Sequence, residues 1–141
     1  MEPIRKTVRQ ASTQIDRERD QFAMTLGITG TQMSVIDFLS NQTENSASQN
    51  QIEHEFEIQR STTTIMLQRM EKRELIRRVV NKNDKRQKKV QLTEKAEKLV
   101  KQIHQYMKND DLALRKNFSE EELETARKVL NYIKDGQSAK R

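Results

Sequence analysis

One interval, residues 75–92, interrupts a chain whose apolar residues otherwise follow helical spacing. Its two ends, LIRRVV at 75–80 and KKVQL at 88–92, are β-branched or alternate polar with apolar residues, and N-K-N-D-K between them is typical of a turn. This pattern predicts a two-stranded hairpin. A single hairpin within a helical chain restricts the fold to a mainly α architecture with a small β element.

Amphipathic spacing predicts four helices before the hairpin. They cover about residues 4–26, 31–41, 49–56 and 60–73. Thr29 with Gln32, and Ser48 with Gln51, have the spacing of capping boxes ahead of the second and third helices. Residues 42–49, QTENSASQ, are polar and are predicted to form a loop.

Two further helices are predicted after the hairpin. Thr93 caps a long helix over about 94–117, and Ser119 with Glu122 forms a capping box for a last helix at about 120–134. The terminal helices carry long apolar stripes, although only 33% of the chain is hydrophobic. This combination predicts an elongated helical shape, a partner subunit, or both.

The helices at 49–56 and 60–73 are short and joined by a tight turn, which is the helix-turn-helix pattern. Helical spacing places Thr63, Met66, Leu67 and Met70 on one buried face of the second helix. The opposite face is small and polar, with Ser61, Thr62, Thr64, Gln68 and Arg69. Small residues allow close approach to the major groove, whereas an ordinary surface helix more often carries Glu, Lys and Gln.

Basic residues are concentrated in the same part of the chain. The net charge is +6, but residues 60–101 alone hold 14 Lys/Arg and 5 Asp/Glu, a local charge of +9, so the remainder carries −3. This distribution favours a polyanionic partner over a merely soluble helical surface. The charge around the hairpin tip is placed to meet phosphates or the minor groove, with Asp84 able to pair with a neighbouring arginine and fix its direction.

This order of elements resembles the MarR family (multiple-antibiotic-resistance regulators), bacterial winged-helix transcription factors, over nearly the whole chain. The segment from Asn83 to Arg86, leading into Val90-Gln91-Leu92-Thr93, is similar to the family's D-x-R…LT wing signature. Residues 61–72 resemble its recognition helix, and Leu75-Ile76 the start of its wing. Two positions depart from the family pattern, because Glu74 and Ala96 stand where glycine is common. At Glu74, either the residue needs a positive φ, at a cost on the order of 1 kcal/mol, or the turn has a different shape.

The resemblance implies a single MarR-type domain over 1–141 that forms a homodimer. Residues 1–28 and 94–141 would be dimerisation helices, and 29–93 a winged helix-turn-helix lobe, with the helix-turn-helix at 49–73 and the wing at 75–93. The implied partner is double-stranded DNA with an inverted-repeat operator. The implied activity is repression relieved by a small-molecule effector, whose pocket residues are unknown. No cysteine is present, which removes a thiol-oxidation switch.

The resemblance also implies roles for individual residues. Base edges would be met by Ser61, Thr62, Thr64 and Gln68, and phosphate or guanine by Arg60 and Arg69. In the wing, Arg86 would enter the minor groove and Asp84 would orient it. Phosphate candidates there are Lys85, Lys88 and Lys89.

Other classes of function are disfavoured. The two histidines, His54 and His104, lie outside any H-E-x-x-H pattern, and neither a phosphate-binding glycine loop nor a nucleophile elbow occurs, so we expect no enzyme, no cofactor and no metal site. No apolar run reaches the roughly 18–20 residues of a membrane span, so we expect a cytoplasmic protein without a membrane partner. The remaining alternative is a non-specific architectural nucleic-acid-binding protein, which would spread its basic residues over several helices.

Overall fold

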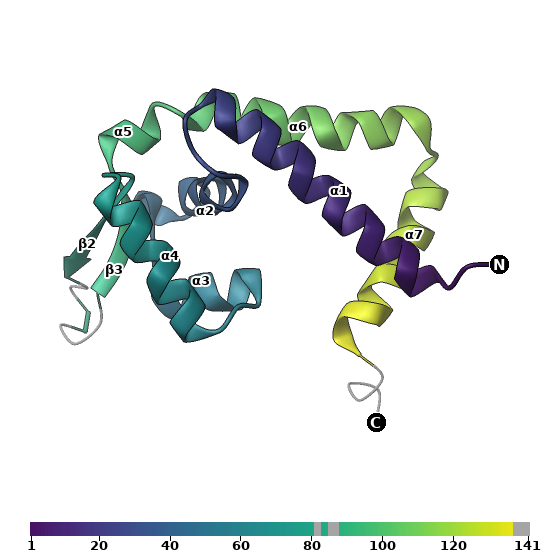
Figure 1. The fold of residues 1–141 in the computed structure, drawn as a ribbon, viewed down its shortest axis with the longest axis horizontal. Helices are drawn as coiled ribbons and strands as arrows, with labels where there is room; N and C mark the ends of the chain where they lie inside the picture. Colours follow the sequence, from purple (N-terminus) through teal and green to yellow (C-terminus); the bar gives the residue numbers. More distant parts are fainter. Residues whose placement is uncertain (81–82, 85–87, 137–141) are drawn as a thin grey trace. The chain divides into compact units, whose positions relative to one another are not determined.

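The computed structural model describes residues 1–80, 83–84 and 88–136 of the chain, and its elements follow the predicted order (Figure 1). The α-helices are α1 (Ile4–Thr25), α2 (Gly30–Ser40), α3 (Gln49–Phe56), α4 (Arg60–Lys72), α5 (Glu94–Glu97), α6 (Val100–Asn117) and α7 (Glu120–Asp135). The remaining elements are the 3-10 turn η1 (Thr43–Asn45) and the strands β1 (Ser46–Ser48), β2 (Ile76–Val80) and β3 (Lys88–Leu92). The predicted mainly α fold with a small β wing is confirmed.

The chain divides into two compact units, one of residues 15–103 and the other of residues 1–14 with 104–141. The first unit contains the helix-turn-helix, the sheet and most of the buried apolar side chains. Its largest fully buried side chains include Met33, Ile36, Leu39, Ile52, Leu67, Met70, Leu75, Ile76, Val90 and Ile103. Each such side chain contributes about 1.5–3 kcal/mol through burial. The core therefore fixes α4 and the sheet with respect to α2 and α3.

The sheet has three antiparallel strands in the order β1-β3-β2, one strand more than predicted. Ala47 and Arg78 both lie opposite Val90, on either side of the central strand. The loop predicted over residues 42–49 was therefore wrong for η1 and β1. The strand β1 is only three residues long, and Ala47 is its single apolar side chain, so its sequence shows no strand periodicity. The strand forms because it pairs with β3.

The predicted helix over residues 94–117 is broken into α5 and α6, which corrects a second prediction. At the break, Leu99 N–H donates to the Ala96 carbonyl at 2.9 Å, three residues back instead of four. Ala96 is fully buried, so α5 is docked on the core before the chain turns. Neither glycine nor proline occurs at the break, so the local sequence does not predict it.

The predicted caps are confirmed. Both reciprocal bonds of the capping box form at α2, α3 and α7, and Thr93 Oγ1 accepts from the Ala96 N–H at 3.2 Å at the start of α5. At α7, the backbone N–H and then the hydroxyl of Ser119 lower the pKa of Glu122 below its ordinary value. These bonds satisfy N–H groups that a helix leaves without partners, which explains why helix starts were predicted within one residue.

Glu74 has φ +63°, which is the first of the two alternatives left open by its departure from the usual glycine. It follows the C-cap Arg73 of α4, and two backbone bonds close a Schellman motif around it: Glu74 N–H to Glu71 O and Leu75 N–H to Met70 O, both at 2.9 Å. A non-glycine residue in this left-handed region costs about 1–2 kcal/mol. The end of α4 therefore stores strain.

We expect Glu74→Gly to raise the free energy of unfolding by about 0.5–1 kcal/mol, because relief of the strain exceeds glycine's greater entropy in the unfolded chain. Urea unfolding at a fixed protein concentration measures the change. The matched control is Glu55→Gly, at an exposed position inside α3, where the same substitution should destabilise by about 1 kcal/mol. Equal losses in both variants would contradict a strain at Glu74.

The second unit exposes much of its apolar surface. Within Glu120–Asp135, every residue of which is described, α7 contains no buried side chain. Large apolar side chains remain exposed along the unit, among them Ile4, Leu112, Leu114, Phe118, Val129 and Leu130. Of the helices in the described part of the chain, none is long and apolar enough to cross a membrane.

Candidate nucleic-acid interface

The helix-turn-helix consists of α3 and α4, joined at Glu57, which has φ +52° at the end of α3. Thr63, Leu67 and Met70 are the buried residues of α4, three of the four predicted for that face. The predicted polar face is exposed at Ser61, Thr62, Gln68 and Arg69. A row of small and hydrogen-bonding side chains therefore lies outward along one helix, where it can approach a nucleic acid.

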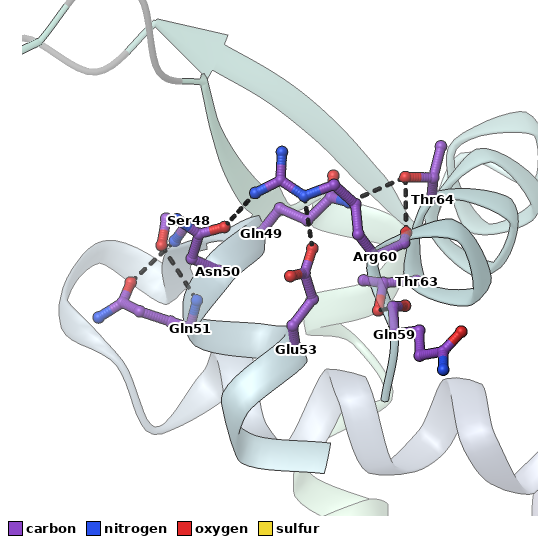
Figure 2. A network of polar contacts seen from close by, with 9 residues as sticks. All are labelled: Ser48, Gln49, Asn50, Gln51, Glu53, Gln59, Arg60, Thr63 and Thr64. Atoms are coloured by element: carbon purple, nitrogen blue, oxygen red, sulfur yellow. Dashed lines mark hydrogen bonds and ion pairs between the residues drawn. The ribbon is translucent and has the colours of Figure 1, made fainter. Parts of the chain in front are cut away.

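Thr64, also predicted on that face, is half-buried and bonded to α3 (Figure 2). Its Oγ1 donates to the Arg60 carbonyl at 2.8 Å, and the Nε2 of Gln49 donates to the same Oγ1 at 2.9 Å. The first bond lies within α4 and the second joins α4 to α3. Thr64 thus serves the packing of the two helices as well as their outer surface.

Arg60 is likewise held by α3 (Figure 2). Its Nη2 donates to Asn50 Oδ1 at 2.8 Å, and its Nε lies 3.7 Å from Glu53 Oε2. The Glu53 side chain is 17% exposed and that of Arg60 is 72% exposed. One edge of the Arg60 guanidinium therefore contacts the protein, and the rest of the group faces solvent. Sequence reasoning missed Gln49, Asn50 and Glu53 because their partners lie on another helix.

The wing strands β2 and β3 are attached at their base. Arg77 donates through Nε and Nη2 to Gln91 Oε1 at 3.1 and 3.0 Å, and Gln91 donates to the Glu44 carbonyl at 3.0 Å. Arg78 Nε lies 3.6 Å from Glu71 Oε1, an ion pair between β2 and α4. These contacts fix the direction in which the hairpin leaves the lobe.

The predicted wing residues are only partly described. Lys88 is exposed and Lys89 half-buried on β3, and Asp84 is half-buried. Lys85 and Arg86 lie outside the described residues, and so does the expected pairing of Asp84 with Arg86. Nevertheless β2 ends at Val80 and β3 begins at Lys88, and these two residues pair with each other. The basic segment 81–87 therefore connects two residues whose positions are fixed by the sheet.

The far end of α4 is anchored by contacts that sequence reasoning did not predict. Arg73 donates through Nη1 to Gln32 Oε1 at 3.3 Å and through Nη2 to the Gly27 carbonyl. Thr93 Oγ1 donates to the Glu74 carbonyl at 2.6 Å, and Lys95 Nζ to the Arg73 carbonyl at 2.9 Å. Both ends of α4 are therefore tied to neighbouring elements.

Comparison with known proteins decides the family. The profile of the MarR family matches residues 26–87. The crystal structure of the transcription regulator MarR from Oenococcus oeni PSU-1 is 36% identical, with a TM-score of 0.86 over 95% of this chain and 100% of that one. The chain belongs to the MarR family. Since this family consists of DNA-binding transcriptional regulators and not enzymes, the predicted family and the non-enzymatic class are confirmed.

Two other relatives are consistent with this family assignment. The Staphylococcus aureus MepR–DNA complex is 25% identical, with a TM-score of 0.83 over 93% of this chain and 95% of that one. The HTH-type transcriptional regulator BilQ from Clostridioides difficile strain CD3 is 30% identical over 94 residues, or 67% of this MarR-family chain. That match spans 64% of the length of BilQ.

Proposed function

We propose that this chain is a homodimeric repressor that binds an inverted-repeat operator in double-stranded DNA and is released by a small-molecule effector. The observation that carries the proposal is the exposed polar face of α4 opposite its buried face, within a chain 25% identical to MepR, which was crystallised with DNA. Release by an effector follows from the family resemblance. The residues of its pocket are not assigned.

The proposed DNA contacts are those of the recognition helix and the wing. Base edges would be read by Ser61, Thr62, Thr64 and Gln68, with Arg69 on guanine or phosphate. Arg60 would reach a phosphate with the part of its guanidinium that faces away from Glu53 and Asn50. Arg86, oriented by Asp84, would enter the minor groove, with Lys85, Lys88 and Lys89 on flanking phosphates.

In the proposed homodimer, helices within 1–28 and 94–141 would interlock with those of another copy. The exposed apolar side chains of the second unit, residues 1–14 with 104–141, support this proposal. Monomeric proteins rarely leave so many large side chains in water, and α7 buries none of its own. A two-fold dimer would place its two copies of α4 in major grooves about 34–36 Å apart, which matches one helical turn of DNA.

Selection of bound sequences from a random DNA pool, with purified protein at physiological salt, tests the proposal. One inverted repeat with half-sites about one helical turn apart is the expected result. Salt-sensitive binding without a consensus would contradict sequence-specific regulation and favour the alternative, an architectural nucleic-acid-binding protein.

Lys88→Ala should lower the affinity for every DNA sequence by the same factor and reduce the log–log salt slope by about 0.9, because a phosphate contact releases one counterion and reads no base. Fluorescence anisotropy from about 50 to 200 mM salt measures the slope. Lys6→Ala, an exposed lysine on α1 in the second unit, is the control and should leave the slope unchanged. A change confined to one sequence would instead indicate a base contact for Lys88.

A further inference from the structure

The hydroxyl of Thr64 has little freedom left for a ligand. A threonine hydroxyl has one proton and two lone pairs. The Arg60 carbonyl can only accept, so it takes the proton, and the Gln49 Nε2 can only donate, so it takes one lone pair. Among the described residues, one lone pair of the half-buried Thr64 hydroxyl remains uncommitted.

The Arg60 carbonyl and the Gln49 amide together keep the hydroxyl in this state. If the proton turned away from the Arg60 carbonyl, two oxygens 2.8 Å apart would face each other without a hydrogen between them. If it turned toward Gln49, it would meet the amide hydrogen that now fills that direction. The two neighbours together therefore leave Thr64 able to accept a hydrogen bond and unable to donate one.

In the major groove, the donors on base edges are adenine N6 and cytosine N4, whereas guanine presents acceptors and thymine an acceptor and a methyl group. We propose that Gln49 is a specificity-determining positioning residue, which holds the Thr64 hydroxyl as an acceptor so that it selects adenine or cytosine at one position of each half-site. This inference rests on the proposed function. None of the residues predicted to read DNA lies on α3. The inference therefore gives α3 a part in choosing the operator.

The neighbouring contact follows the same design. Asn50 Oδ1 takes an N–H of Arg60 Nη2, and Glu53 lies beside its Nε, so one edge of the guanidinium is committed to α3. Figure 2 shows Gln49 and Asn50, adjacent in the first turn of α3, each directed at a side chain of α4. The first turn of α3 thus sets the polarity of Thr64 and the direction of Arg60.

A double-mutant cycle tests the inference. The operator selection is repeated with the wild-type chain, Gln49→Met, Thr64→Val and the double variant. Methionine retains the length of glutamine without its donor, and valine retains the shape of threonine without its hydroxyl. We expect each single variant to lose about 3- to 10-fold of the preference for adenine or cytosine at one position, the value of one hydrogen bond. The double variant should lose no more, because Gln49 acts through Thr64.

Thermal unfolding and binding to non-operator DNA accompany each selection, because a purely structural role would change these and leave the base preference intact. Gln102→Met, the same substitution at an exposed position of α6, is the control. It should change neither the thermal unfolding nor the base preference. The inference is overturned if Gln49→Met keeps the preference that Thr64→Val loses, or if the two losses add. It is also overturned if Thr64→Val changes no position of a consensus that the wild type selects, in which case the proposed function stands. If the wild type selects no consensus, the proposed function fails as well.

Discussion

Leu130→Glu is expected to dissociate the proposed dimer and to weaken operator binding by two orders of magnitude or more. Leu130 lies on the apolar stripe of α7 and is 47% exposed in the single chain. With Leu114 and Leu123 it lines a shallow pocket between α6 and α7. A carboxylate at this position must either lose its water in an apolar interface or keep the interface apart.

The size of the effect on DNA follows from avidity. When two lobes are joined, the second binds at the effective concentration set by the first, and affinity exceeds that of one lobe by about 10²–10⁴-fold. Analytical ultracentrifugation gives the oligomeric state, and anisotropy with a full operator and a half-site gives the two affinities. The half-site affinity should change little, since the helix-turn-helix lies in the other unit.

The control for Leu130→Glu is Lys128→Gln, which changes the net charge by the same single unit. Lys128 lies two residues away, about 200° around the helix and off the apolar stripe, so this variant should remain a dimer. A Leu130→Glu chain that stays dimeric and binds the full operator normally would place the interface elsewhere than on the exposed side chains of α7.

The parts of the fold that sequence reasoning predicted are those determined within one helical turn or one strand. The capping pairs Thr29–Gln32, Ser48–Gln51 and Ser119–Glu122 are three residues apart, and each forms as expected. The buried face of α4 follows from spacing alone. At Glu74 the departure from the family pattern marked an unusual turn but left two geometries open, and the structure has the one with positive φ.

The parts that were missed depend on contacts between distant segments. The strand β1 exists because β3 pairs with it, about 45 residues later in the chain. The break between α5 and α6 follows the burial of Ala96 in the core. Gln49 and Thr64 are 15 residues apart on two helices, and their bond depends on how those helices pack. No local pattern carries this information, because the same residues on isolated helices would face solvent.

Arg86→Ala should reduce operator affinity about 5- to 150-fold, which is the range for loss of one arginine that contacts bases, and should leave the proposed dimer folded. The expectation rests on the D-x-R pattern at Asp84 and Arg86 and on the described base of the wing. Val80 and Lys88 pair at the ends of β2 and β3, and the bonds of Arg77 and the ion pair of Arg78 hold those strands in place. Strands that are held in place before binding lose less entropy when the interface forms.

The variant Arg86→Lys distinguishes the contribution of the positive charge of Arg86 from that of its guanidinium group. If Arg86 only neutralises a phosphate, lysine should restore most of the affinity, whereas insertion into a narrow A·T-rich minor groove favours the less strongly hydrated guanidinium and lysine should restore little. Anisotropy with operators that differ only in A·T content beside each half-site distinguishes the two. Arg5→Ala, an exposed arginine of α1, controls for the loss of one charge. Unchanged affinity in Arg86→Ala would remove the wing from the proposed interface and leave α4 as the proposed surface that reads DNA.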